Sequence, residues 1–556
     1  MQRKPTVWQD HLINDVIYSE YPERSMYSFL FEKTEDCLSD TAIEFEGKKT
    51  TYRKLRRQID HAACSLAAAG IRKGDVISVI SPNIPQAVIT IYAANKLGAA
   101  ANIMHPLLSS TELLSHIEET GSKAVFILDS LYGKIACHEW KDAAPLIVLY
   151  SVRDSLGFPK KLFVKRTDVK DMGGRVTSWN AFLKDTAADT EYTEGDPDDT
   201  AVILYSGGTT GIPKGVCLTN RNINSYAVQG HEAGACMLKA RSLAVLPIFH
   251  GFGLCSGIHN MLTCKSHIYL VPAYDAAKCS SLIFRKKIEV IFAIPAMYDA
   301  LLHCDEIEES DCRFLKLLYC GGDKLPSRTE RRFNSVMEKK GLSTRIIVGY
   351  GLTECVAGCT SNAMFVQKEG TVGMALPDNE LKIVAPGTEN ELPLGETGEL
   401  CVSGPAVMKA YFNNESATKK ALKTHGDGKT WLHTGDAFSV DKDGFYTFHS
   451  RLSRMLVVNG FNVFPETVES ALMKVEGVSG CCVVGLESKT GGDRVAAAVC
   501  LKDGFSSLTP EHIIEQCKAF LPEYALPSKM LIMKKLPVTK MGKTDYLKVS
   551  EKLREA

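Results

Sequence analysis

A loop rich in glycine and hydroxyl side chains interrupts the middle of this 556-residue chain. It follows the apolar run from Ala201 to Tyr205, which predicts a buried strand. The glycines let backbone N–H groups turn inward because no side chain blocks them, and the hydroxyls and one lysine add further donors. Such a loop has the groups needed to hold a polyphosphate. The residues predicted to contact phosphate are Ser206, Gly207, Gly208, Thr209, Thr210, Gly211 and Lys214.

The common nucleotide-binding P-loop has a different order of residues. It requires Gly-x4-Gly-Lys-Ser/Thr, whereas here Pro213 precedes Lys214 and Gly215 follows it. The triplet Gly542-Lys543-Thr544 fails as well, because Pro537 stands where that pattern needs its first glycine. The chain is therefore not expected to bind phosphate as a P-loop protein does.

The segment from Ser206 to Gly215 resembles the phosphate loop of adenylate-forming enzymes, which include acyl- and aryl-CoA synthetases, stand-alone adenylation domains and firefly luciferase. The hexapeptide Gly349-Tyr350-Gly351-Leu352-Thr353-Glu354 resembles that family's second signature. The resemblance implies that Tyr350 stacks on adenine beside Gly351 and that Thr353 reaches the α-phosphate. It also implies that Glu354, together with Thr210, holds Mg²⁺.

Three further segments match the family's nucleotide site. Cys320-Gly321-Gly322-Asp323-Lys324 resembles the segment that borders adenine, which implies contacts from Gly322 and Asp323. Asp436 resembles the aspartate that accepts both ribose hydroxyls, an arrangement that makes a directional, charge-assisted contact. Arg451 matches the arginine that also reaches the ribose.

Two candidates act on the acid itself. His250 aligns with the residue that borders the acid's carboxylate and the thiol channel, although a histidine among apolar residues can also be a packed core side chain. Amino-acid-activating relatives commonly have an aspartate there, so His250 argues against an α-amino acid. Lys543 matches the lysine that enters from the small domain and bridges the carboxylate and the AMP oxygens, where its charge offsets the developing negative charge. The residues expected to be catalytic are Lys543, Thr210, Glu354 and His250.

The sequence departs from the family pattern near the expected interdomain hinge. Arg454 occupies the pivot position in Ser450-Arg451-Leu452-Ser453-Arg454, where relatives usually have aspartate or lysine. Val457 stands where they have a further lysine. The neighbouring loop at Gly460 is where relatives admit the pantetheine thiol, so the thioester step is the less secure half of the expected reaction.

Helix-like and strand-like segments alternate along most of the chain, as in Tyr52–Ala69, Asp75–Ile80 and Pro85–Leu97. Such alternation predicts an α/β fold with parallel-rich sheets flanked by helices. From Arg454 onward a compact α+β domain is expected, since a helical face in Pro465–Val475 is followed by strand-like runs. We predict a large N-terminal domain, residues 1–453, that binds AMP and the acyl group, and a small mobile C-terminal lid, residues 454–556.

Composition excludes several other classes of protein. Lys+Arg and Asp+Glu both number 65, so the chain lacks the basic excess of a nucleic-acid binder. Met1–Ile17 contains no apolar signal-peptide core, and polar residues interrupt Ala87–Met104, which is predicted to be a buried helix rather than a membrane span. The 18 scattered cysteines suggest free thiols in the cytoplasm.

The polar segment between residues 151 and 199 is basic in its first part and acidic in its later part. We interpret it as a solvated surface loop, and contact with anionic lipid is the alternative. The basic residues are Lys160, Lys161, Lys165 and Arg166.

Together, the motifs predict an ATP-dependent, AMP-forming carboxylic acid–CoA ligase that uses ATP, Mg²⁺ and CoA. Gly207 and Gly208 resemble the fatty-acyl members, and Gly321 and Gly349 lack side chains where the family's acyl tunnel runs, which would suit a long or bulky acid. One alternative enzyme loads the acyl group onto a carrier protein's phosphopantetheine. A catalytically silent scaffold is the alternative from another class. The sequence does not identify the acid, the oligomeric state or the pathway.

Overall fold

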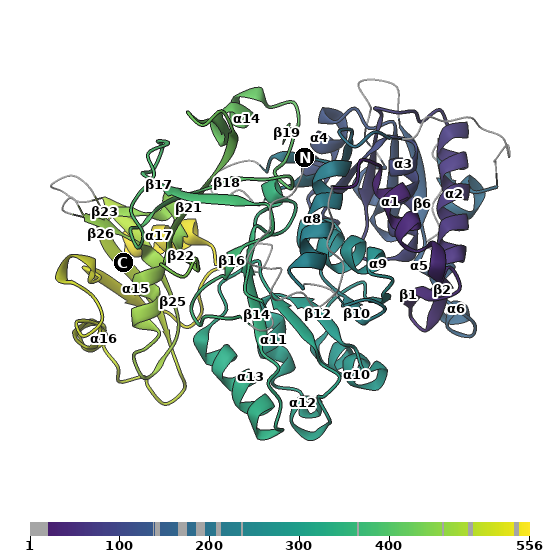
Figure 1. The fold of residues 1–556 in the computed structure, drawn as a ribbon. Coiled ribbons are helices and arrows are strands. Elements are labelled where there is room, and N and C mark those ends of the chain that lie inside the picture. Colours follow the sequence, from purple (N-terminus) through teal and green to yellow (C-terminus); the bar gives the residue numbers. More distant parts are fainter. Residues whose placement is uncertain are drawn as a thin grey trace. The chain divides into compact units, whose positions relative to one another are not determined.

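Two large sheets with mainly parallel strands confirm the predicted α/β class (Figure 1). In the eight-stranded sheet only the β19–β9 and β8–β9 pairs are antiparallel. Its strands follow the order β19 (Ala410–Tyr411), β9 (Gly215–Thr219), β8 (Thr200–Tyr205), β4 (Ala100–Met104), β3 (Val76–Ile80), β5 (Ala124–Leu128), β6 (Leu146–Tyr150) and β7 (Val176–Ser178).

The nine-stranded sheet is parallel from β14 to β1 and antiparallel at its ends. Its strands follow the order β16 (Met374–Ala375), β15 (Thr360–Ser361), β14 (Ile346–Tyr350), β13 (Leu317–Cys320), β12 (Val290–Ala293), β10 (Arg241–Ala244), β11 (His267–Leu270), β1 (Thr41–Phe45) and β2 (Lys48–Thr51).

Helices pack on the faces of both sheets, as their amphipathic sequences require. Leu318 of β13, Ile283 of α10 and Phe333 of α13 belong to one buried core, and Val125 of β5 and Leu113 of α4 belong to another. The helices of this part are α1 (Met26–Lys33), α2 (Tyr52–Ala68), α3 (Pro85–Lys96), α4 (Ser110–Glu119), α5 (Val152–Ser155), α6 (Lys160–Phe163), α7 (Trp179–Phe182), α8 (Asn220–Glu232), α9 (Met261–Thr263), α10 (Ala276–Lys286), α11 (Pro295–Leu301), α12 (Asp305–Glu309), α13 (Ser327–Lys339) and α14 (Glu415–Ala421).

The C-terminal part has its own sheet and core. Val468 and Leu472 of α15 pack with Val483 and Val499 of the three-stranded sheet. Its elements are β23 (Leu456–Val458), β24 (Phe461–Val463), α15 (Pro465–Leu472), β25 (Val478–Glu487), β26 (Asp493–Leu501), α16 (Pro510–Cys517), β27 (Lys529–Ile532) and α17 (Tyr546–Glu555). The remaining strands are β17 (Glu380–Val384), β18 (Gly398–Ser403), β20 (Leu422–Thr424), β21 (Thr430–Val440) and β22 (Tyr446–Arg451).

The computed structural model describes residues 21–136, 138, 145–164, 175–184, 195–206, 213–234, 237–363, 366–458, 461–487, 493–538 and 544–556. The chain forms two compact units: the first is Met1–Leu381 with Val402–Leu432, and the second is Lys382–Cys401 with His433–Ala556. A functional domain boundary near residue 453 stays a prediction.

The prediction of one buried helix over Ala87–Met104 was wrong. Helix α3 ends at Lys96 and strand β4 begins at Ala100. Gly98 lies between them with a φ of 71°, a left-handed conformation that terminates a helix and that glycine adopts without steric cost. In the part of the chain that the structure describes, no helix is both long enough and apolar enough to cross a bilayer.

Among the residues that the structure describes, fifteen cysteines carry free thiols, and most of these are buried. Burial raises the pKa of several of them, among them Cys217 to about 11. These thiols therefore stay protonated and behave as small apolar side chains. Cys264 departs from the expected pattern, because it is disulfide-bonded.

Candidate active site

The two ends of the glycine-rich loop are joined at the base of a hairpin. The backbone N–H of Ser206 donates to the carbonyl oxygen of Lys214 at 3.0 Å, which extends the antiparallel β8–β9 ladder. A P-loop instead runs from a strand into a helix, so this geometry agrees with the exclusion made from sequence. The loop residues Gly207, Gly208, Thr209, Thr210 and Gly211 lie outside the described residues.

A short edge strand connects the hairpin with the predicted metal ligand. Tyr411 of β19 pairs with Val216 of β9, and its ring lies 4.8 Å below the ammonium of Lys214. The Tyr411 hydroxyl donates to Oε1 of Glu354 at 2.7 Å, and the backbone N–H of Met408 donates to the Glu354 carbonyl oxygen at 2.8 Å. One segment therefore positions both the end of the loop and the carboxylate.

The chemistry of this carboxylate fits a magnesium ion. Glu354 is buried, and Mg²⁺ prefers carboxylate and hydroxyl oxygens. Burial raises the pKa of Tyr411, and the charge of Glu354 raises it further, so the phenol stays protonated and acts as a donor. Sequence reasoning missed Tyr411 because its partner lies 57 residues away and a two-residue strand has no periodic pattern.

The turn after Glu354 has an unusual backbone. Val356 has φ 64° and ψ −63°, and the N–H of Ala357 donates to the carbonyl oxygen of Cys355 across it. A β-branched residue rarely adopts this γ-turn conformation, which costs about 1–3 kcal/mol. The Val356 carbonyl oxygen faces Gly251, where an added Cβ would lie only 1.8 Å away. The His250 loop and the Glu354 turn thus touch backbone to backbone.

His250 is exposed, which rules out the packed-core alternative. Its Nδ1 accepts a hydrogen bond of 3.2 Å from the backbone N–H of Phe252, so the neutral ring carries its proton on Nε2. The following residues, Phe252–Asn260, form a π-helix, a rare conformation that is common at functional sites.

Gly321 and Gly349, which we interpreted as signs of a wide acyl tunnel, each lie close to another part of the protein. An added Cβ at Gly349 would lie 2.9 Å from the Thr360 carbonyl oxygen, so the close β14–β15 pairing requires a glycine there. An added Cβ at Gly321 would lie 3.4 Å from the Phe252 ring, which already occupies that side. Neither glycine therefore indicates a long acid.

The remaining nucleotide candidates of the first unit lie at strand ends. Tyr350 is the last residue of β14, and Gly351 and Thr353 follow it. An added Cβ at Gly351 would lie 1.9 Å from the Ala357 carbonyl oxygen, so this residue must be small. Gly322 has a φ of 80° and begins an exposed turn with Asp323 after β13. The carboxyl ends of parallel strands commonly present ligand-binding loops.

The two ribose candidates are neighbours in the second unit. Asp436 of β21 and Arg451 of β22 are register partners, and Arg451 Nε lies 3.6 Å from Asp436 Oδ1. Asp436 is buried, whereas Arg451 is half-exposed. This pair presents a carboxylate, a group that can accept from two hydroxyl donors, beside a guanidinium.

Glu399 is a second functional candidate that sequence reasoning missed. Its carboxylate accepts hydrogen bonds from His433 Nδ1 at 3.0 Å and from the Gly435 N–H at 3.1 Å, immediately before Asp436. Burial acts to raise the pKa of Glu399, but the hydrogen bonds from His433 and the backbone outweigh it and hold the pKa below its usual value. Glu399 therefore stabilises the turn that carries Asp436.

Arg454, the predicted pivot, is anchored inside the second unit. Its guanidinium pairs with Glu466 and with Glu469 of α15, donates to the Val483 carbonyl oxygen at 3.1 Å, and stacks 3.8 Å from the Tyr546 ring. Only 14% of its side chain is exposed. The predicted thiol-channel residue Gly460 and the catalytic candidate Lys543 lie outside the described residues.

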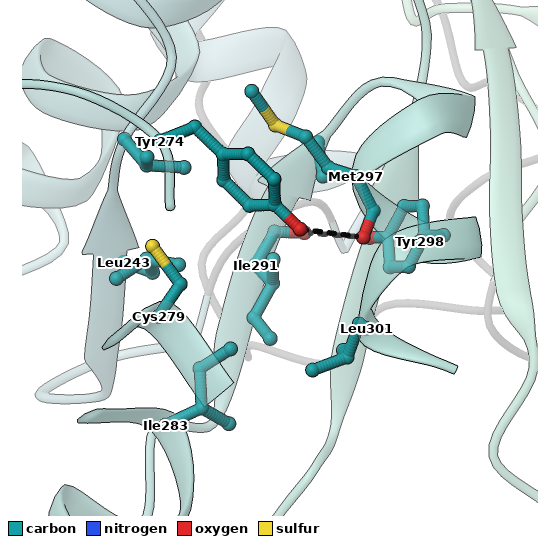
Figure 2. A pocket seen from close by; sticks show the side chains of 10 residues that line it. Leu243, Tyr274, Cys279, Ile283, Ile291, Met297, Tyr298 and Leu301 are labelled. Atoms are coloured by element: carbon teal, nitrogen blue, oxygen red, sulfur yellow. Dashed lines mark hydrogen bonds between the residues drawn. The ribbon is translucent and has the colours of Figure 1, made fainter. Parts of the chain in front are cut away.

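A cavity of about 20 Å³ lies elsewhere in the first unit (Figure 2). That volume accommodates about one water molecule, and its lining is apolar apart from the Cys279 thiol and two tyrosine hydroxyls. The Tyr274 hydroxyl donates to the Met297 carbonyl oxygen at 2.9 Å, and the Tyr298 hydroxyl donates to the Tyr319 carbonyl oxygen at 2.9 Å. Ile291 of β12 points into it, whereas the next residue, Phe292, packs edge-on against Phe252 at 5.8 Å. The cavity therefore lies on the face of β12 opposite to the face that Phe252 contacts.

Comparisons with known proteins agree with this architecture. The profile of the AMP-binding enzyme family matches residues 30–412, and that of the AMP-binding enzyme C-terminal domain matches residues 467–543. The long-chain-fatty-acid–CoA ligase of Bacillus subtilis (strain 168) is 29% identical over 553 residues, which cover 96% of each chain. The feruloyl-CoA synthase of Amycolatopsis sp is 27% identical over 512 residues, 90% of this chain and 94% of that protein.

The crystal structure of ATP-bound MatB from Rhodopseudomonas palustris superposes with a TM-score of 0.84 at 24% identity, over 96% of this chain and 99% of that chain. The fold is therefore that of adenylate-forming enzymes. The chain belongs to the AMP-binding enzyme family, whose profile spans most of its length.

We predict that Tyr411→Phe impairs adenylate formation while leaving the fold intact. The variant keeps the ring under Lys214 but removes the donor to Glu354. A hydrogen bond to a charged group contributes about 1.5–3 kcal/mol, so acid-dependent exchange of pyrophosphate into ATP should fall roughly 10- to 100-fold. The Mg²⁺ concentration for half-maximal rate should rise. Tyr274→Phe, which removes a hydroxyl at the distant cavity, is the matched control and should leave both values unchanged.

We predict that the Glu399 carboxylate makes a pH-dependent contribution to the free energy of unfolding. Because its folded-state pKa is depressed, this stability is present above the usual pKa of 4.5 and is lost as the pH falls through the folded-state value. Urea midpoints of wild type and Glu399→Gln should therefore differ most above pH 4.5 and converge in more acidic solution. Exposed Glu396→Gln should follow wild type throughout, and a constant difference between wild type and Glu399→Gln would contradict the assignment.

Arg454→Met should destabilise the second unit, because it leaves Glu466 and Glu469 partly buried without their cation. Removing one partner of a buried ion pair costs about 3–5 kcal/mol. Amide hydrogen exchange in α15, followed by mass spectrometry, should accelerate accordingly. Lys518→Met, which breaks an exposed ion pair in the same unit, should change it little. Adding Glu466→Gln and Glu469→Gln to Arg454→Met should restore much of the protection.

Proposed function

We propose that this protein is an ATP-dependent, AMP-forming carboxylic acid–CoA ligase acting on a fatty or other bulky acid. The observation that carries the proposal is the junction at Tyr411, which ties the exit of the glycine-rich loop to the buried Glu354 carboxylate. Membership of the AMP-binding enzyme family supports it, as do relatives named long-chain-fatty-acid–CoA ligase and feruloyl-CoA synthase.

In the first half-reaction, a carboxylate oxygen of the acid forms a bond to the α-phosphorus of ATP, and the bond to the pyrophosphate oxygen breaks. The loop from Ser206 to Lys214 binds the phosphates, and Lys543 bridges the carboxylate and the α-phosphate. Glu354 and Thr210 would hold Mg²⁺, which when bound would supply positive charge beside the pyrophosphate. Tyr350, Gly322 and Asp323 border adenine, and Asp436 and Arg451 hold the ribose.

In the second half-reaction, the thiol sulfur of CoA forms a bond to the acyl carbon, and the bond between that carbon and the AMP oxygen breaks. AMP is a good leaving group, whereas the oxygen of a free carboxylate is not, which is why the acid is first adenylated. His250 lies beside the acid, with its orientation fixed by the Phe252 N–H. The thiol enters near Gly460.

Fifteen of the cysteines that the structure describes carry free thiols, whereas Cys264 is disulfide-bonded. This excess of free thiols supports a reducing compartment, and we place the reaction in the cytoplasm. Gly321 and Gly349 do not bear on the choice of acid, because the Phe252 ring and the Thr360 carbonyl oxygen account for them. The long-chain-fatty-acid–CoA ligase of Bacillus subtilis, matched over nearly the whole chain, favours a fatty acid.

A carboxylic acid panel tests the proposal. With ATP and Mg²⁺, at least one fatty or aryl acid should release pyrophosphate, and added CoA should yield the acyl thioester and AMP. Lys543→Ala should slow acid-dependent exchange by roughly 100-fold or more, whereas Lys540→Ala, an equal change of charge in the same segment, should not.

Each contrary outcome has a definite meaning. Adenylation without turnover of free CoA would contradict the proposed CoA ligase activity and would support an enzyme that loads the acyl group onto a carrier protein. Wild-type exchange in Lys543→Ala would refute the role of that lysine. No exchange with any acid would favour a silent scaffold.

A further inference from the structure

Three large apolar side chains project from one short stretch of the first unit. Phe158 and Phe163 are each 83% exposed, and Leu162 is 63% exposed. Helix α6, which contains Leu162 and Phe163, buries none of its residues. Figure 1 shows α6 at the periphery, near β1 and β2. Single exposed apolar residues are ordinary, but a cluster of three large ones marks an interaction surface.

Basic side chains surround this cluster. The Lys48 ammonium donates to the Asp154 carbonyl oxygen at 3.4 Å, and the Lys48 side chain lies beside Gly157, next to Phe158. Burial lowers the pKa of Lys48, and the charges of Lys54 and Lys161 lower it further, so these three cations are close together.

Arg153 adds a fourth cation, since its Nε donates to the Lys161 carbonyl oxygen at 3.1 Å. Two acids oppose these charges: Asp154 lies beside Lys48, and Glu46 pairs with Lys160 at 2.6 Å. Within the described part of the chain, the cations named here therefore outnumber the anions by five to two around the exposed rings. An anionic partner matches this surface in charge.

We propose that this region, the α6 surface, docks the protein onto an anionic lipid bilayer. The α6 surface consists of Phe158, Leu162 and Phe163 with Lys48, Lys54, Lys160 and Lys161. Aromatic and aliphatic side chains flanked by lysines are typical of segments that lie in the membrane interface. The lysines reach the lipid phosphates while the apolar side chains enter the acyl boundary.

A lipid surface fits these residues better than a protein partner does. Lysine is depleted in protein–protein interfaces, whereas the α6 surface contains four lysines. The apolar side chains also project outward, and a fluid bilayer accepts projecting side chains without a complementary hollow. The inference does not depend on the proposed ligase activity, although a membrane is where an amphiphilic acid would accumulate.

Co-sedimentation of the full-length protein with vesicles tests the inference. Wild type should bind vesicles that contain phosphatidylglycerol and should bind phosphatidylcholine vesicles much more weakly. Raising the salt concentration should weaken the former binding, because salt screens exposed charges. Phe158→Ser combined with Phe163→Ser should reduce the partition coefficient at least about tenfold. Lys160→Gln combined with Lys161→Gln should reduce binding and flatten its salt dependence.

The matched control is Leu394→Ser combined with Leu547→Ser, which removes side chains that are 68% and 75% exposed elsewhere on the chain. This variant should bind like wild type. Exchange activity with a water-soluble acid should be the same in every variant, which separates this test from that of the ligase. Equal vesicle binding by wild type and Phe158→Ser/Phe163→Ser would overturn the inference. So would absence of binding, or self-association of wild type that the same substitutions abolish.

Discussion

The hydrogen bond between Tyr411 and Glu354 is the constraint on which the first unit's candidate site depends. A buried carboxylate needs a donor, because burial removes the water that would otherwise solvate it. Here the donor comes from a two-residue edge strand that also supports Lys214 at the exit of the glycine-rich loop. Three segments distant in sequence are thereby held in one arrangement before any substrate binds, which is how a site avoids reorganisation during reaction.

The strained turn at Val356 is likewise held in place by a segment that is distant in sequence. Its backbone would relax if the His250 loop moved away, but Gly251 lies directly against the Val356 carbonyl oxygen and Gly351 against that of Ala357. Strain of this kind persists only where the surrounding packing determines the conformation. The two loops are therefore coupled, and a substitution larger than glycine at either position would displace the turn that follows Glu354.

Local patterns predicted the fold well. Alternating helix-like and strand-like runs anticipated the parallel sheets, and α3 and β3 lie almost where they were expected. The exception was Ala87–Met104, where high hydrophobicity on both sides of Asn95 and Lys96 concealed a change from helix to strand at Gly98. Periodicity cannot separate a fully buried helix from a fully buried strand, because neither has a polar face.

The candidate site was predicted from motifs, and what the motifs missed is non-local. Asp436 and Arg451 were assigned to the ribose separately, and their pairing across β21 and β22 became visible only in the structure. Tyr411 and Glu399 act through partners tens of residues away and stand in no motif. The absence of a side chain at Gly349 was interpreted as room for the acyl group, although the nearby Thr360 carbonyl oxygen is enough to require a glycine there.

Arg454 makes contacts that differ from those expected of the aspartate or lysine that relatives usually have at this position. An aspartate or lysine at a pivot can exchange its contacts with water at little cost, since such groups are well hydrated at a surface. The Arg454 guanidinium instead holds two carboxylates and a backbone carbonyl within the second unit. Breaking these contacts would leave buried charge without a partner. The rotation that the predicted mobile lid requires would therefore need backbone torsions that leave the Arg454 side chain in place, which favours residues preceding it.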